Sequence, residues 1–178
     1  MSKTAAALAV ALMALFSIPM SAQLGNFGSL LPSGNVYVGV SYGRLTDVIN
    51  KQSYKGWNAS AEFFPFGRLP HLGLVADGSG FYRSGVTQYL AVAGPRLSTN
   101  YAKWRPFIDA MAGIRHDNST NTSNFVSNTL LIDIGAGTDY KLPFKNFSWR
   151  VQGDYMHSHS ESHNQDDFRA STGIVWRF

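Results

Sequence analysis

The fold of this chain is decided by stretches such as TLLIDIGAGTDY, residues 129–140. Leu130, Ile132 and Ile134 alternate with Asp133 and Gly135 along this stretch. Successive side chains of an extended backbone point to opposite faces, so one face is apolar and the other is polar or small. A period of two predicts a β-strand with two chemically different sides.

The same alternation recurs along the chain, in segments of about ten residues that turn-forming residues separate. The expected strands are residues 35–44, 56–64, 71–83, 87–98, 106–115, 129–140, 147–158 and 168–178. No helical pattern intervenes, so neighbouring strands should pair antiparallel. The phase of the fourth strand is open: if Arg96 points inward, Tyr89 and Leu97 point outward.

The connections between these strands alternate in length and composition. Residues 45–55, 116–128 and 159–167 form long polar loops, whereas 65–70, 99–105 and 141–146 form short links, and the short loop 84–86 is an exception. Long loops at one end and short turns at the other are typical of outer-membrane barrels.

The beginning of the chain reads as a secretory signal peptide over residues 1–22. Lys3 precedes an apolar run over 5–18, and Ser21 and Ala22 form a small-residue cleavage site. The alternative, a membrane anchor, needs about 20 apolar residues. We expect residues 23–34 to be a periplasmic lead-in and 35–178 to form the barrel domain.

Composition excludes several classes of protein. The 178-residue chain has no cysteine, so an exported domain must be held by its own core or by a membrane. The net charge is +4, but the basic residues do not cluster, which argues against nucleic-acid binding. The pattern implies no cofactor.

The polar faces of the expected strands carry both acids and arginines, whereas the mature chain's lysines fall in loops or turns. Arginine suits a crowded interior because its planar fork matches a carboxylate. A soluble barrel would instead turn its polar face to water. The sequence therefore predicts a lumen charge network of Glu62, Asp77, Arg96, Asp109, Arg115, Asp133, Asp139, Arg150, Asp154, Arg169 and Arg177, with Arg83 on the same face.

The opposite faces carry no charge through their middle, and aromatic residues gather near their ends. One group contains Tyr42, Trp57, Tyr89, Tyr155 and Phe168, and the other contains Phe63, Phe107, Phe147, Trp149, Trp176 and Phe178. All of these except Phe107 have the outward phase. Two aromatic belts around an apolar band mark lipid interfaces. We expect an all-β fold: a transmembrane, eight-stranded, antiparallel up-and-down β-barrel.

The end of the chain, STGIVWRF over 171–178, is similar to the C-terminal assembly signal of bacterial outer-membrane proteins, with Ile174, Trp176 and Phe178 as its apolar positions. With GWNAS at 56–60, GPR at 94–96 and RASTG at 169–173, the whole mature chain resembles the outer-membrane β-barrel domain family, of the small OmpA and OmpX type. The resemblance implies the outer membrane of a Gram-negative bacterium, termini in the periplasm, and recognition by the barrel-assembly machinery.

The histidines at 157–163 are weak candidates for metal ligands. His157, His159 and His163 lie beside acids, a set that suits zinc or copper. A polar external loop explains them equally well, so we expect no metal site. Some eight-stranded barrels deacylate lipid A with a histidine and a serine on one face, but Ser158 has the opposite phase to His157.

We therefore expect a protein that is not an enzyme, with a structural or surface-interaction role. Its partners would be outer-membrane lipid and, through the loops, an extracellular ligand. The interior of eight strands is barely wide enough for side chains, which favours a lumen plugged by ion pairs. The alternatives are a narrow passive channel and a lipid-A-modifying enzyme.

Overall fold

The computed structural model describes residues 33–47, 50–65, 69, 71–83, 85–119, 125–160 and 163–178. Eight strands make up this part of the chain: β1 (Gly34–Asp47), β2 (Asn50–Phe63), β3 (Leu72–Arg83), β4 (Val86–Ser98), β5 (Trp104–Ser119), β6 (Phe125–Lys141), β7 (Phe147–Ser160) and β8 (His163–Arg177). The predicted signal peptide and residues 23–32 of the predicted lead-in lie outside the described residues.

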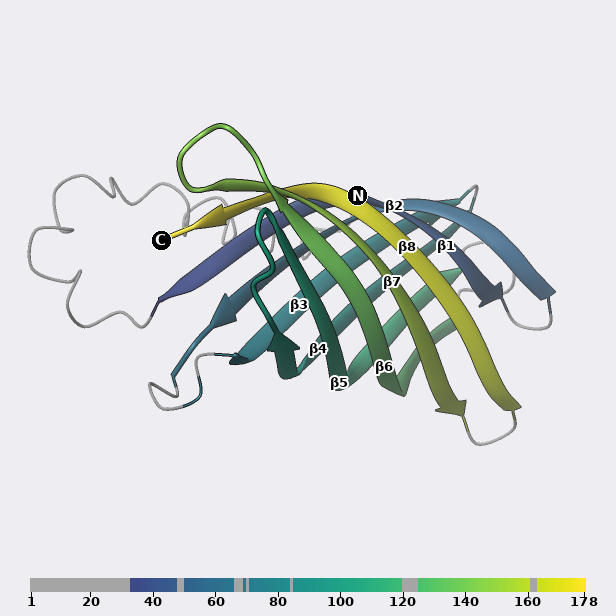
Figure 1. Ribbon diagram of the computed structural model, residues 1–178. Coiled ribbons are helices and arrows are strands. Elements are labelled where there is room, and N and C mark those ends of the chain that lie inside the picture. The colour runs from purple at the N-terminus through teal and green to yellow at the C-terminus, as the bar shows by residue number, and fades with distance from the viewer. Residues whose placement is uncertain are drawn as a thin grey trace, which may run out of the picture. The chain divides into compact units, whose positions relative to one another are not determined.

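Each strand pairs antiparallel with the next one, and β8 pairs with β1, so the sheet closes into a barrel (Figure 1). The closing pair runs from Asn35 opposite Arg177 to Arg44 opposite Phe168. Closure leaves no unpaired sheet edge. The prediction of an eight-stranded, antiparallel, up-and-down barrel is confirmed. Within the described residues, no helix is long and apolar enough to cross a membrane.

The three long loops were predicted too long, because the strands continue through most of their residues. The β1–β2 ladder runs on from Arg44 opposite Ser53 to Asp47 opposite Asn50. Leu45 and Tyr54 keep the inward phase there and are fully buried. Polar residues extend these strands because the neighbouring strand offers backbone partners and an interior to fill. The same holds at the ends of β5 and β6 and of β7 and β8.

The alternation expected from the sequence separates an inward face from an outward face on every strand. Leu130 is 73% exposed on the outside of β6, whereas Asp133 is completely buried on the inside. The structure also decides the phase of β4. Arg96 is 1% exposed and pairs with Asp109 of β5, while Tyr89 and Leu97 point outward.

The interior contains more apolar side chains than the polar faces of the strands suggested. The buried apolar cluster consists of Leu45, Tyr54, Val75, Phe81, Val86, Leu90, Val92, Met111, Leu131 and Met156. Several of these side chains come from the strand extensions that were predicted as loops. The barrel is therefore filled by an apolar cluster as well as by an ionic one.

Candidate functional site

Arg169 of β8 is the centre of the buried ionic network and ties four strands together. Its Nη1 donates to Asp77 Oδ1 of β3 at 2.8 Å, and its Nε donates to Asp154 Oδ2 of β7 at 2.7 Å. Its Nη2 lies 3.4 Å from Asp133 Oδ2 of β6, and Nη1 also contacts the Ser79 hydroxyl. The guanidinium is fully buried. It therefore crosslinks opposite walls of the barrel.

Arg150 of β7 forms the second crosslink, nearer the short turns. It donates two hydrogen bonds to Asp139 of β6, from Nε to Oδ1 at 2.6 Å and from Nη2 to Oδ2 at 3.0 Å. Its guanidinium lies 5.1 Å from the ring centre of Tyr37 and 4.7 Å from that of Phe107. Stacking on two rings replaces part of the hydration that a buried cation loses. Asp139 also accepts a 3.0 Å bond from Arg177 Nη2.

Arg96 and Glu62 form a third group beside the second one. Arg96 Nε donates to Asp109 Oδ2 at 2.7 Å, and its Nη1 lies 3.6 Å from Glu62 Oε2. Glu62 also accepts a 2.7 Å bond from the Asn35 amide, and Arg105 Nη2 lies 3.7 Å from its Oε1. These contacts make Glu62 a junction between β1, β2, β4 and β5.

Arg115 anchors a smaller ionic group toward the opposite end of the barrel. Its Nη1 donates to Asp167 Oδ2 at 2.6 Å and its Nε to Asp117 Oδ1 at 2.9 Å. Burial raises the pKa of Asp117, although the neighbouring Arg115 lowers it. Asp117 and Asp167 fall in residues that were predicted as loops, so they were missed. Continued alternation past Arg115 would have revealed Asp117, and alternation back from Arg169 would have revealed Asp167.

The structure brings all of the charged residues assigned to the lumen into the barrel interior. Each of them is buried except Arg177, whose side chain is 29% exposed at the end with the short turns. Arg83 shares their phase but lies exposed at the strand end, 6.0 Å from the ring centre of Tyr54. The interior arginines thus have carboxylate partners, as buried charges require.

Carboxylates outnumber arginines in the middle of the network. Asp77, Asp133 and Asp154 share the single guanidinium of Arg169. One oxygen of Asp133 and one oxygen of Asp109 are buried without a hydrogen-bond partner in the described structure. Three carboxyl groups therefore lie around one guanidinium in the middle of the lumen.

A polar cluster lies on the outer wall at the strand ends that the longer loops connect. His157 Nδ1 is 2.7 Å from Asp166 Oδ1, and the Tyr155 hydroxyl donates to the same oxygen at 2.7 Å. Ser158 points into the lumen and is 1% exposed, so it cannot act together with His157. Among the described residues, no group of three His, Cys, Asp or Glu could hold a metal. The side chains of His159 and His163 are outside the described set.

The C-terminal apolar positions complete the closing seam of the barrel. Phe178 and Gly34 exchange backbone hydrogen bonds of 3.1 and 3.4 Å. The rings of Trp176 and Phe178 lie 5.4 Å apart, and Ile174 faces outward. The residues of the predicted assembly signal therefore lie at the end of β8, the strand that closes the barrel against β1.

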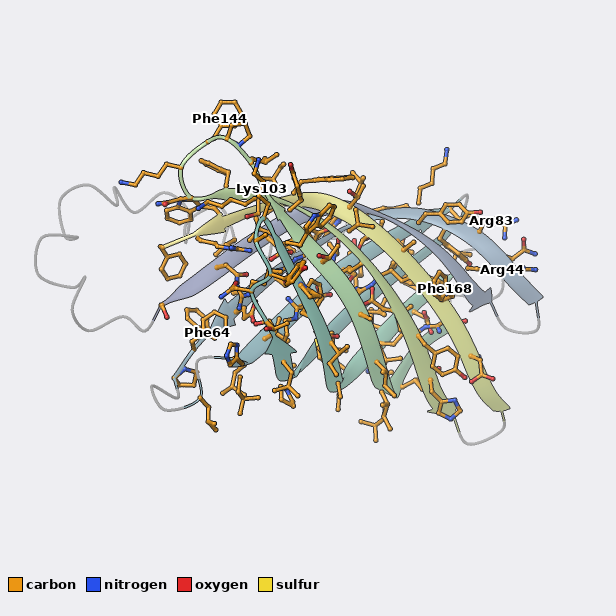
Figure 2. All side chains as sticks on the ribbon, viewed as in Figure 1. Arg44, Phe64, Arg83, Lys103, Phe144 and Phe168 are labelled. Carbon is orange, nitrogen blue, oxygen red and sulfur yellow. The ribbon has the colours of Figure 1, made fainter. Side chains whose placement is uncertain are left out.

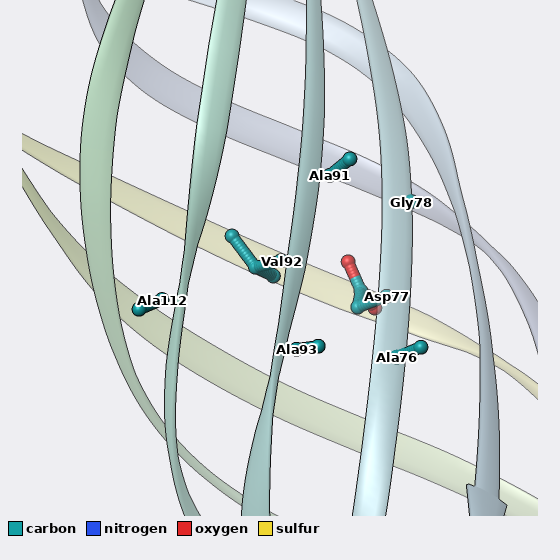
Figure 3. A pocket seen from close by; sticks show the side chains of 7 residues that line it. All are labelled: Ala76, Asp77, Gly78, Ala91, Val92, Ala93 and Ala112. Atoms are coloured by element: carbon teal, nitrogen blue, oxygen red, sulfur yellow. The ribbon is translucent and has the colours of Figure 1, made fainter.

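The outer wall over β3, β4 and β5 has a shallow, open hollow (Figure 3). Small side chains line it, chiefly Ala76, Gly78, Ala91, Ala93 and Ala112. The Asp77 carboxylate behind this wall is already engaged by Arg169 and Asn58. The hollow therefore presents apolar surface and offers no free group for polar recognition.

No protein-family model and no curated protein matches the chain. Solved structures do match. The Neisserial surface protein A, NspA, has a TM-score of 0.68 and 11% identity over 82% of this chain and 97% of its own. The N-terminal β-barrel of Pseudomonas aeruginosa OprF has 0.58 and 18%, covering 82% and 99%. The outer membrane enzyme PagL has 0.51 and 15%, covering 79% and 98%. The chain has the fold of small eight-stranded outer-membrane β-barrels.

Proposed function

We propose that this protein is an outer-membrane β-barrel of a Gram-negative bacterium, with a structural or surface-interaction role and no enzymatic activity. The observation that carries the proposal is that the barrel has apolar side chains on its outside and charged side chains inside, the reverse of a water-soluble barrel. Val40 is 65% exposed on the outside, whereas Arg150 and Arg169 are completely buried inside. Water does not favour that arrangement, but hydrocarbon does, because a closed sheet satisfies its own backbone bonds.

The orientation follows from the lengths of the connections. Outer-membrane barrels have short periplasmic turns and longer extracellular loops. The turns after β4 and β6 would then face the periplasm together with both termini. The extended ends of β1, β5 and β7 would project from the cell surface. Their mixed charges, with Arg44, Lys55 and Asp166 on the outer face, suit contact with a ligand or another cell.

The lumen is proposed to be closed rather than conducting. Arg150 lies against two aromatic rings, and Arg169 joins opposite walls through carboxylates on three other strands. Ions would have to break these contacts in order to pass. Protein inserted in planar bilayers should therefore show no discrete conductance steps. Regular single-channel openings would favour the passive channel instead.

The experiment that tests the membrane assignment is gel mobility of the detergent-folded protein, heated against unheated, with circular dichroism alongside. A folded membrane barrel should resist dodecyl sulfate until it is boiled and should give a β spectrum. A chain that stays soluble without detergent and shows no heat-dependent shift would contradict the proposal.

A lipid-modifying enzyme is the second candidate, because His157 has an acidic partner on the lipid-facing side and an outer membrane enzyme, PagL, shares the fold. The register neighbours of His157 on that side are Ile132 and Asp166, and neither carries a hydroxyl or thiol nucleophile. We therefore expect no acyl release from lipid A by the folded barrel. Release that His157→Ala abolishes without loss of folding would establish the enzyme.

A further inference from the structure

Two of the short turns lie side by side and bring lysines together. These are the turn of residues 99–103, between β4 and β5, and the turn of residues 142–146, between β6 and β7. The Lys141 N–H donates to the Lys103 carbonyl at 2.8 Å, one step beyond the pairing of Trp104 with Tyr140. Lys103 and Lys141 are thus cross-strand neighbours, and both are exposed.

The two turns and the strand segments next to them contain no acid that could balance these cations. Neither residues 99–108 nor residues 140–149 contain an aspartate or a glutamate, while Lys145 adds a third exposed cation. The nearest carboxylates along the two strands, Asp139 of β6 and Asp109 of β5, are buried and hold arginines. Like charges directly opposite each other weaken a ladder. The pair is therefore best stabilised by an anion from outside the protein.

Exposed aromatic side chains surround the lysines. Tyr101 is 75% exposed and Phe144 is 69% exposed, and the rings of Trp104 and Tyr140 lie 4.7 Å apart. Figure 2 shows Phe144 and Lys103 at the same end of the barrel, away from Arg44 and Arg83. Aromatic rings with lysines beside them are typical of the headgroup layer of a membrane. They favour a lipid anion over a soluble one.

The opposite end of the barrel does not have this excess of basic over acidic side chains. Asp117, Asp166 and Asp167 accompany the basic residues there. Arg115 is already bonded to two of these acids. A preference for anions should therefore belong to the end with the short turns.

We infer that Tyr101, Lys103, Lys141, Phe144 and Lys145 form a binding surface for the phosphodiester headgroups of anionic phospholipids. The inference rests on the proposed membrane function. The lipids would lie in the leaflet next to the short turns, with their phosphates among the lysine ammonium groups and their glycerol region against the two exposed rings.

The test compares spin-labelled phosphatidylglycerol with spin-labelled phosphatidylcholine around the full chain folded in phosphatidylcholine vesicles. Electron paramagnetic resonance gives the relative association constant of the lipid at the barrel surface. A lysine near an anionic lipid strengthens binding about five-fold. Wild-type protein should select phosphatidylglycerol at least about five-fold. The triple variant K103Q/K141Q/K145Q should lose that selectivity.

The matched control is the triple variant R44Q/K55Q/R83Q at the opposite end, which removes the same charge and should keep the selectivity. Equal association of the two lipids with wild-type protein would overturn the inference, as would selectivity that only the control variant loses. Inorganic phosphate that abolishes the selectivity would show a soluble-anion site and overturn the assignment to lipid. A heat-dependent gel shift of every sample separates these outcomes from failure of the barrel proposal.

Discussion

Replacing Arg169 by methionine tests whether the ionic network holds the barrel together. Methionine keeps most of the stem volume and removes the guanidinium, which is bonded to Asp77 and Asp154 and lies 3.4 Å from Asp133. Removing one partner of a buried ion pair costs about 3–5 kcal/mol, because the remaining charge is left uncompensated.

The three carboxylates do not multiply that cost by three. Asp77 keeps hydrogen bonds from Asn58 and Ser79, and Asp154 keeps contacts from the Gln152 amide. Asp133 loses the arginine beside it while its other oxygen is already unpaired. We therefore expect Arg169→Met to lower the free energy of unfolding by about 3–5 kcal/mol.

The assay is urea unfolding of the barrel in lipid vesicles, followed by tryptophan fluorescence. Arg83→Met is the matched control, because Arg83 is exposed at the strand end and should cost about 1 kcal/mol or less. Adding Asp133→Asn to Arg169→Met should recover part of the loss, since the uncompensated charge is gone. An Arg169→Met barrel within about 1 kcal/mol of wild type would refute the reasoning.

Two further predictions concern the backbone and the lipid-facing wall. A Cβ at Gly113 would overlap the Ala91 carbonyl oxygen, whereas a Cβ at Gly78 meets nothing within 4 Å. Gly113→Ala should therefore lower stability by about 1–3 kcal/mol in the same urea assay, while Gly78→Ala should change it by about 0.5 kcal/mol or less. Equal effects would contradict the close approach of β4 and β5. Ile134 is outward-facing near the middle of β6, and Ile134→Lys should cost about 2–4 kcal/mol in vesicles, whereas Asn128→Lys near the strand end should cost about 0–1. A tolerated lysine at position 134 would indicate that water, not hydrocarbon, faces this wall.

The phase of most strands was readable from the sequence, because a strand with unlike faces alternates strictly. Asp133 and Asp139 are inward, with Leu130 and Ile132 outward, as their spacing predicted. The phase of Arg96 was ambiguous because its strand carries apolar residues on both faces, with Leu90 and Val92 inside and Leu97 outside. Its phase became definite only through the ladder that places it opposite Asp109.

The extent of the strands was not readable near the longer loops. Residues such as Ser53 and Asn118 have low strand propensity, yet they continue the ladders because a paired neighbour supplies backbone partners. Asp117 and Asp167 were missed for the same reason. Local composition indicates whether a residue by itself favours a strand. It does not show whether a neighbouring strand is present to pair with it.

By itself, the sequence determined that the chain makes strands with one charged and one apolar face, and that arginine and carboxylates share the charged one. This follows because the two-residue period is local to each strand. Only the tertiary structure decided which charges meet. Arg169 and Asp77 are 92 positions apart in the chain, and closure of β8 on β1 helps bring β3 and β8 around a common lumen. The sequence contains 11 acids, any of which could in principle meet a given arginine, and the shear of the closed barrel selects among them.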